Sequence, residues 1–438
     1  MAEVFAVIHN DLDGAASGGV IQRKYGAEHV TILQTNYDKN LPIKRMMLAD
    51  IVVVADFSLS AESFKILLDA GKRVIWLDHH IDNVNKIEQD LRNLGVDPSA
   101  IEGIRDDQHC GALLCWKYFF ADYEIPRALI LIDDFDRWQW KYREDTTAFF
   151  YGIDLFDNRP GTKNGNILWS QLLETPNRRI AVVISTGRMV ADYSTRQNKV
   201  WVDDLAFPAK LDGFSVLVAN LRLVTSLVFD NAENRNSFDA LVMFGWTADT
   251  GRYRYSIYSP DNKKEVLPIA VSHGGGGHPY ASGWSSDNIE VELPKEAAPA
   301  LEEAIAPYRA LADEVKQNQL LQQCVAKRDT IALRSMGYFT EFEPLKVPAI
   351  GLNTPYLPNQ LDGIKYHLGV ISSTGYVAQV AVGYNIVKCG KYRVCVAPLL
   401  PSVDLERLRK SVPGGKIIDG NVWYYTDKCP VLQMQRTI

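Results

Sequence analysis

The chain has 438 residues, of which 47% are hydrophobic and 23% are charged, so we expect two or three globular domains. The net charge is −6 and no long basic run is present, which argues against a long nucleic-acid duplex as a partner. No apolar run reaches the roughly 18 residues that a membrane-spanning helix needs. The N-terminus lacks the basic start of a secretory signal. We therefore expect a cytoplasmic protein with no membrane partner.

Short apolar runs alternate with amphipathic stretches over the first 80 residues. Helical spacing predicts helices at 14–25 and 60–70. The apolar runs predict strands at 4–8, 30–33, 51–55 and 74–77. Because these runs are continuously hydrophobic, both faces of the sheet should be covered, which favours a parallel, doubly wound α/β fold. Sheets of this kind bind ligands beyond the carboxyl ends of their strands.

Acidic residues and histidines follow three of these four strands directly. They are His9, Asp11 and Asp13 after the first strand, Asp56 after the third, and Asp78, His79 and His80 after the fourth. Carboxylates crowded at one edge of a sheet repel one another, and a divalent cation relieves that repulsion. Carboxylate and imidazole donors suit Mn²⁺ or Mg²⁺, and the histidines favour manganese.

Other interpretations of the first cluster are open at this point. A calcium loop fails because Val20 occupies the position that requires a bidentate glutamate. D-L-D-G after a strand also fits a haloacid-dehalogenase-type phosphatase, in which the first aspartate is a nucleophile. An aspartate at a strand end is often only a helix cap, although Ser58 or Ser60 could cap the helix after Asp56. Capping alone does not explain three successive clusters.

The remaining chain predicts further helices and two more modules. Helices are expected at 110–120, 126–132 and 178–205, and a single helix at 295–327. Runs with strand character lie at 215–221, 239–246, 253–259, 376–384, 391–398 and 422–426. We predict an α/β domain at 1–190, a connector at 191–213, a smaller α/β domain at 214–328 and a mostly β module at 329–438. No internal repeat is evident in the sequence.

A glycine run, HGGGGHPYASGW at 273–284, marks the second domain. Glycines allow a ligand to approach the backbone, and Pro279 fits the first turn of a helix that would follow them. The start of a helix is a good anion site, to which His278 could add a hydrogen bond. A flexible turn is the alternative for four glycines alone.

The charged clusters together resemble the motifs of the DHH phosphoesterase superfamily. HNDLDG, VVADFS, LDHH and IDDFDRW match its four N-terminal motifs in order, and GGGGHPYASG resembles the signature of the associated second domain. The likeness covers residues 1–325 and leaves out the last 110 or so residues. Within the superfamily, HNDLDG and FDRWQW are most similar to the NrnB-type oligoribonucleases, or nanoRNases. The resemblance makes the haloacid-dehalogenase interpretation remote.

The resemblance implies a centre of two manganese ions, with magnesium as the alternative metal. One ion would be held by Asp11, Asp56 and His9, and the other by Asp13, Asp56, His79 and Asp136. Asp56 would bridge the two ions. His9 departs from several relatives, in which the histidine lies four residues before the D-x-D pair rather than two.

The resemblance also implies roles for residues that do not hold metal. Asp78 would orient the histidines, and His80 would contact the phosphate or the leaving oxygen. Asp133 and Asp134 would cap the helix end or support the site. The terminal nucleotide or phosphate would be bound by the substrate-binding residues Gly275, Gly276, Gly277 and His278.

Two further features concern substrate binding. Relatives often carry an arginine before the glycines where this chain has Tyr258, and Arg252 or Arg254 could compensate, although both fit solvated strand residues. Trp138 and Trp140 could stack on a base, which contributes about 1–3 kcal/mol per base, or they could pack in the core.

The six cysteines are scattered and form no C-x-x-C pair, so a zinc site or a disulfide framework is not expected. We expect reduced, structural thiols at Cys110, Cys115, Cys324, Cys389, Cys395 and Cys429.

These features predict a manganese-dependent phosphodiesterase that cuts short oligonucleotides to mononucleotides. Cyclic mono- or dinucleotides, 3′,5′-bisphosphates and longer single strands are alternative substrates. A non-catalytic scaffold is the alternative of another class. A homo-oligomer is compatible with the sequence.

Overall fold

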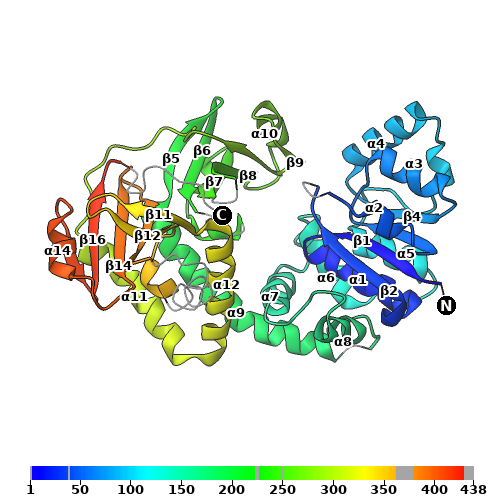
Figure 1. Ribbon diagram of the computed structural model, residues 1–438, viewed down its shortest axis with the longest axis horizontal. Helices are drawn as coiled ribbons and strands as arrows, with labels where there is room; N and C mark the ends of the chain where they lie inside the picture. Colours follow the sequence, from blue (N-terminus) through cyan, green and yellow to red (C-terminus); the bar gives the residue numbers. More distant parts are fainter. Residues whose placement is uncertain are drawn as a thin grey trace. The chain divides into compact units, whose positions relative to one another are not determined.

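The structure is a computed structural model that describes residues 2–37, 40–176, 178–221, 226–247, 250–361 and 378–428. The chain divides into two compact units, Met1–Asp192 and Tyr193–Ile438, and each is described by itself (Figure 1). Parts of two predictions, Cys429 and residues 376 and 377, lie outside the described residues.

The first unit contains one four-stranded parallel sheet in the order β2-β1-β3-β4. All four strands were predicted, and each differs from its predicted bounds by at most two residues at either end. They are β1 (Val4–His9), β2 (Val30–Thr35), β3 (Ile51–Ala55) and β4 (Arg73–Leu77). Because β2 lies on one side of β1 and β3 on the other, the order reverses between β1 and β3. Ligands bind at such a switch point in open parallel sheets.

Helices cover both faces of this sheet (Figure 1). Alternate residues of β1 separate into two cores: Ala6 and Ile8 belong to one, and Phe5 and Val7 to the other. The first core includes residues of α1 (Leu12–Tyr25), α5 (Gly111–Phe119), α6 (Arg127–Asp136), α7 (Arg143–Ile153) and α8 (Lys163–Leu172). The second includes residues of α2 (Ile43–Met46), α3 (Ala61–Asp69) and α4 (Ile81–Asn93). This arrangement confirms the doubly wound fold.

The second unit contains two six-stranded mixed sheets. The first has the order β5-β6-β7-β8-β10-β9, with β5 (Phe207–Leu211), β6 (Phe214–Asn220), β7 (Ala240–Thr247), β8 (Arg252–Tyr258), β9 (Gly276–His278) and β10 (Ala281–Ser286). The second has the order β11-β12-β13-β14-β16-β15, with β11 (Tyr338–Phe342), β12 (Val347–Asn353), β13 (Val380–Ile386), β14 (Tyr392–Pro398), β15 (Lys416–Ile418) and β16 (Asn421–Thr426). The predicted fold class, including a β-rich C-terminal part, is confirmed.

Helices pack around these sheets. They are α9 (Arg179–Leu205), which was predicted, α10 (Leu267–Ser272), α11 (Leu301–Gln317), α12 (Gln319–Met336) and α14 (Leu405–Lys410). The single helix predicted at 295–327 is wrong. Asn318 interrupts it with an extended backbone, and its side-chain oxygen accepts hydrogen bonds from the amides of Leu320 and Leu321, which starts a second helix.

The helix predicted after the glycine run is also wrong. Residues Gly276–His278 form strand β9, and Pro279 lies in the two-residue turn to β10, where His278 pairs with Ala281. The neighbouring helix, α10, precedes the glycines and is followed by Gly274, whose φ of 76° is in the left-handed region that glycine adopts without strain. The glycines therefore follow the end of a helix, and no helix start faces them.

Two smaller expectations concern thiols and membranes. Cys110, Cys115, Cys389 and Cys395 are buried free thiols, and Cys324 is buried as well. Within the described ranges, no helix is both long and apolar enough to cross a bilayer.

A buried ion pair fixes the end of α9 to the second sheet of its unit. The Arg393 guanidinium lies 2.6 Å from the Asp204 carboxylate, and the Tyr308 hydroxyl donates to the same carboxylate at 2.8 Å. Arg393 is only 2% exposed, so its charge depends on this partner.

We predict that Asp204→Ala lowers the free energy of unfolding by about 3–5 kcal/mol, because it leaves the Arg393 charge buried and unpaired. The matched control is Asp203→Ala, which removes an exposed partner of Lys199 and should change stability by about 1 kcal/mol or less. Urea unfolding of both variants measures the difference. Equal losses would contradict this prediction.

Candidate metal centre

The first cluster lies where β1 meets α1. His9 is the last residue of β1, and Asp11 caps α1 by accepting a hydrogen bond from the Gly14 amide at 2.9 Å. Asp13 lies in the first turn of α1 and is 2% exposed. A Cβ at Gly14 would lie 2.2 Å from the His9 carbonyl oxygen, so the glycine permits this tight turn. The D-L-D-G sequence therefore places both aspartates at the switch point between β1 and β3.

Asp56 follows β3 directly and is the most constrained residue of the site. Its φ is 53°, a left-handed conformation that costs a non-glycine residue roughly 1–3 kcal/mol. Its amide donates to the Leu77 carbonyl at 2.8 Å, and the residue is 1% exposed. The end of the neighbouring strand thus holds Asp56 in a conformation that it would rarely adopt alone.

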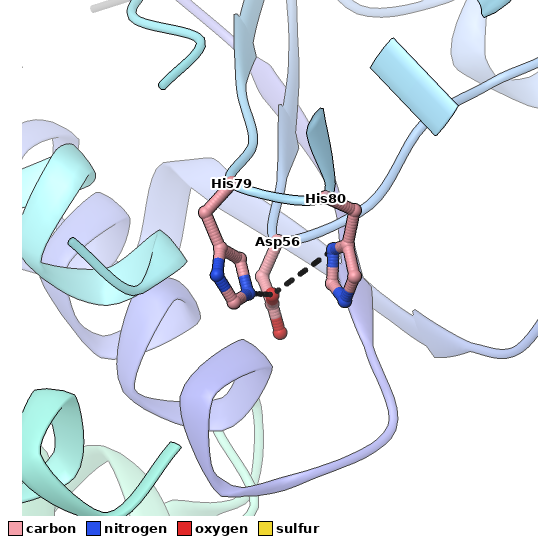
Figure 2. Close-up of side chains that lie close together, drawn as sticks. All are labelled: Asp56, His79 and His80. Carbon is pink, nitrogen blue, oxygen red and sulfur yellow. Dashed lines mark ion pairs between the residues drawn. The ribbon is translucent and has the colours of Figure 1, made fainter. Parts of the chain in front are cut away.

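Asp78, His79 and His80 follow β4. Asp78 is fully buried and accepts hydrogen bonds from His80 Nδ1 at 2.8 Å and from Ser58 Oγ at 2.6 Å. Burial opposes its ionisation, but these hydrogen bonds and the neighbouring His80 charge outweigh burial and lower its pKa. His79 Nε2 lies 3.2 Å from Asp56 Oδ1. Figure 2 shows both histidines directed toward Asp56.

Asp136 reaches the same place from the last residue of α6. Its Oδ2 lies 3.5 Å from His79 Nε2, and Asp13 Oδ2 lies 3.8 Å from the same nitrogen. Residues from four separate parts of the chain therefore meet at one point.

Three groups of donor atoms are close enough to hold a metal ion, with all atoms of a group within 4.8 Å of one another. They are the group of His9, Asp11 and Asp56, the group of Asp13, His79 and Asp136, and the group of Asp56, His79 and His80. The first two correspond to the ligand sets implied by the motifs, with Asp56 in the first set only. The third group links Asp56 to His79.

The donor chemistry fits divalent cations. Asp56 Oδ2 and Asp136 Oδ2 are buried and have no hydrogen-bond partner within the described part of the chain. A buried carboxylate oxygen without a partner is costly, and a cation would compensate for it. Carboxylate oxygens and imidazole nitrogens, without thiolates, suit Mn²⁺ or Mg²⁺.

Burial and mutual repulsion raise the pKa of three carboxyl groups. Burial together with Asp136 raises the pKa of Asp13 to about 6. Burial together with Asp11 raises the pKa of Asp136 to about 7. Burial and then Asp13 raise the pKa of Asp56 well above its ordinary value. Burial lowers the pKa of His79, which favours the neutral imidazole that binds metal.

The start of α5 holds Asp13, a role that the sequence did not reveal. The amides of Gly111 and Ala112 donate to the two Asp13 oxygens at 2.6 and 2.8 Å. A Cβ at Gly111 would lie 2.5 Å from the Asp56 Cβ and 3.1 Å from Asp13 Oδ2. Only glycine leaves room for both carboxylates. Gly111 is visible in the sequence as a small residue at a helix start, but its neighbours come from distant segments.

The other two acids of IDDFDRW have structural partners. Asp133 accepts a hydrogen bond from the Cys110 amide at 2.7 Å, at the start of α5. Asp134 accepts from the Lys141 and Tyr142 amides at 2.7 and 3.1 Å and so holds the loop after α6. Neither belongs to a metal-binding group of the described residues.

Two pairs of aromatic residues lie near donor residues, one in sequence and the other in space. Trp138 and Trp140 are partly exposed, with ring centroids 5.0 Å apart, just after Asp136. Tyr37, which the sequence did not single out, stacks on Phe57 at 4.4 Å and lies 6.0 Å from the His9 ring. Base stacking on Trp138 and Trp140 stays a prediction.

The predicted substrate-binding residues lie in the second unit. Gly276, Gly277 and His278 are exposed in strand β9, and Gly275 is half-buried before it. The candidate compensating arginine, Arg252, pairs with Asp287 at 2.9 Å in an exposed position. Arg252 thus behaves as a surface strand residue.

No protein-family model matches the chain. The chain is 25% identical over 261 residues to an uncharacterized protein of Acanthamoeba polyphaga mimivirus. The aligned region covers 56% of this chain and 55% of that protein, so the match spans about half of each.

Several solved structures are similar to the chain at low identity. The pGpG-specific phosphodiesterase PggH of Vibrio cholerae is 13% identical, with a TM-score of 0.38 over 72% of this chain and 99% of that one. The DHH domain of PF0399, a member of the s1p family of ribosomal proteins, is 12% identical, with a TM-score of 0.44 over 72% and 86%. RecJ of Thermus thermophilus in complex with Mn²⁺ is 11% identical, with a TM-score of 0.34 over 97% and 68%. The family resemblance continues to rest on the motifs of this chain.

We predict that the metal-free protein loses stability as the pH rises from about 5 to 8. Folded Asp13 and Asp136 have pKa values near 6 and 7, above the unfolded value of about 3.9, so the folded state binds more protons in this range. The stability that these protonated carboxyl groups contribute is present at low pH and is lost as the pH rises through 6–7. Melting temperatures recorded against pH in the presence of a chelator measure this loss. The Asp136→Asn variant should show a smaller decrease of melting temperature with pH. A melting temperature that rises over this range would contradict it.

We predict that Gly111→Ala weakens Mn²⁺ binding at least about tenfold, because the added methyl displaces Asp13 and Asp56. Helix propensity alone would make this change stabilising by about 1 kcal/mol. Calorimetric titration with Mn²⁺ measures the affinity. The control is Lys117→Ala, at an exposed position of the same helix, which should bind Mn²⁺ normally. Unchanged binding by Gly111→Ala would refute the role of Gly111.

Proposed function

We propose that the protein is a metal-dependent phosphodiesterase that cuts short oligonucleotides to mononucleotides with two manganese ions. The observation that carries this proposal is the interlocking of three donor groups through Asp56 and His79. A site that only capped helices would not need carboxylate oxygens from three segments and imidazole nitrogens from a fourth to meet at one point.

The proposed ligand sets follow the geometry. His9, Asp11 and Asp56 would hold one ion, and Asp13, His79 and Asp136 the second, with Asp56 shared between them. When bound, divalent cations supply the positive charge that neutralises phosphate oxygens and makes a water molecule acidic enough to attack phosphorus. The residues of the chain fix where that charge lies.

We assign His80 to the substrate and Asp78 to the orientation of His80. Asp78 binds His80 Nδ1, so the ring would contact a phosphate or a leaving oxygen through Nε2. Ser58 holds the second Asp78 oxygen, so the carboxylate cannot rotate freely. This pair would place a hydrogen-bond donor beside the metal ligands without adding a fifth carboxylate to the four already there.

The hairpin of β9 and β10 is proposed to bind the terminal phosphate of the substrate. A Cβ built on Gly276 would have no neighbouring atom within 4 Å, so the space beside this backbone is open. His278 is exposed on the same short strand. Backbone amides and an imidazole donor give such a hairpin the chemistry to bind one anion. A substrate of a few nucleotides also fits a chain that has a net charge of −6 and no long basic run in its sequence.

We predict that the purified protein with Mn²⁺ converts a 5-mer RNA to mononucleotides and that Asp13→Ala lowers the rate at least about 100-fold. Chromatography of the products measures the reaction. The control is Asp122→Ala, which removes an exposed carboxylate outside the site and should leave the rate unchanged.

The outcomes separate the candidate functions. Cleavage of cyclic dinucleotides or 3′,5′-bisphosphates in preference to the 5-mer would assign the same site to small nucleotides. Mn²⁺ binding without hydrolysis of any of these substrates would reject the oligonucleotide assignment, and a protein that binds no Mn²⁺ would be a scaffold. An unaltered rate for Asp13→Ala would remove the site from the reaction.

A further inference from the structure

The two sheets of the second unit have the same topology. In each, the first two strands are antiparallel, the second and third are parallel, and the remaining neighbours are antiparallel. In each, a six-residue helix separates the fourth strand from the fifth, and the last two strands form a hairpin at the sheet edge. Order, direction and helix position therefore agree over six strands.

The register of the strands gives a residue-by-residue match. Asn220 pairs with Phe244 in the first sheet, as Asn353 pairs with Tyr384 in the second. The matched positions also share their burial. One common hydrophobic core contains Ala240 with Val380, Val242 with Val382, Tyr255 with Val394, Ile257 with Val396, Leu211 with Phe342, and Trp284 with Tyr424. Corresponding faces of the two sheets thus enter one core.

Helices cover the opposite face of each sheet. Leu205 of α9 packs with Leu217 and Leu241 of the first sheet. Ile305 of α11 packs with Ile350 and Ala381 of the second sheet. Because Leu217 corresponds to Ile350 and Leu241 to Ala381 in the strand registers, the outer faces correspond as well.

Two asparagines make reciprocal contacts where the copies meet. The Asn220 side-chain amide donates to the Phe244 carbonyl at 3.0 Å, and that of Asn353 donates to the Tyr384 carbonyl at 3.0 Å. Each amide also contacts the side-chain oxygen of the other, at 3.5 and 3.2 Å. Both asparagines are buried and end the second strand of their sheets. This exchange is the pattern expected at a two-fold axis between equivalent domains.

The hairpins, in contrast, differ in sequence. Gly274 and Gly414 match, with φ values of 76° and 69°. The following strand is Gly276–His278 in the first copy and Lys416–Ile418 in the second. Side chains thus replace two glycines, and Ile418, which is 4% exposed, replaces the exposed histidine. The second hairpin keeps the fold but lacks the imidazole and the open backbone of the first.

We propose that residues 338–426 are a second copy of the domain formed by residues 207–286 and act as its permanent internal partner. The copy covers the apolar face of the first domain, as the second subunit of a dimer would. Its own hairpin lacks the glycines and the histidine proposed to bind an anion. The part of this proposal that concerns the hairpin rests on the proposed function. The part that concerns the partner rests only on the fold.

A double-mutant cycle in the full chain tests the internal pairing. Asn220→Ala and Asn353→Ala should each lower the melting temperature by several degrees, because each leaves a buried amide or oxygen unpaired. The double variant should lose clearly less than the sum, since the two residues share one contact. The control is Asn93→Ala, at an exposed helix position of the first unit, which should melt as the unaltered protein does. Fully additive losses, or no loss for Asn353→Ala, would overturn the pairing.

One variant in each hairpin tests the loss of anion binding. With 5-mer RNA and Mn²⁺, His278→Ala should raise KM at least tenfold, whereas Ile417→Ala, at an exposed position of the second hairpin, should change it less than twofold. A similar rise for both variants would show that the second hairpin also binds substrate and would overturn the assignment. If His278→Ala has no effect while the asparagine cycle behaves as expected, the hairpin assignment fails and the internal pairing stands.

Discussion

Repulsion between buried carboxylates dominates the first unit. Asp13 and Asp56 are buried, Asp136 is partly buried beside them, and the pKa values of all three are raised because burial and like charge oppose ionisation. A fold tolerates such a cluster when something else stabilises the charged forms. Divalent cations would do so with the donor atoms present, and their binding would then restore the stability that the metal-free protein is predicted to lose at neutral pH. Stability and proposed activity therefore depend on the same unfavourable interaction.

The surrounding backbone keeps these groups close despite their repulsion. In the parallel sheet, the carboxyl ends of β1, β3 and β4 lie at the same edge. The strand order reverses between β1 and β3, which leaves a place for a ligand at that edge. Two glycines, Gly14 and Gly111, allow the helices to approach where a Cβ would collide. The α5 amides that bind Asp13 partly offset its desolvation, and Ser58 and His80 do the same for Asp78. These hydrogen bonds orient Asp13 and Asp78 without any cation.

The second unit uses duplication for a different purpose. One copy presents an exposed glycine–histidine hairpin at its edge, while the other contributes an equivalent apolar face and a hairpin with the buried Ile418 in place of the histidine. Once two copies lie in one chain, only one needs to retain a binding element, because the shared core depends on burial and not on the hairpin. Because the hairpin lies outside the shared core, Lys416–Ile418 can differ in sequence from Gly276–His278 while the apolar face of the second copy stays the same in kind.

The sequence by itself determined the strands of the first unit, the doubly wound class and the set of charged residues at the strand ends, because continuous apolar runs and chain order are local properties. The motif resemblance had already selected Asp136 over Asp133 and Asp134 as a ligand. Only the tertiary structure showed what Asp133 and Asp134 bind, because their partners, the backbone amides of Cys110, Lys141 and Tyr142, lie in other segments. It also replaced the expected helix at Pro279 with a hairpin, because pairing with β10 outweighs the local preference of proline for a helix start. The duplication was invisible in the residues, since a buried face requires apolar side chains of suitable volume and not particular identities.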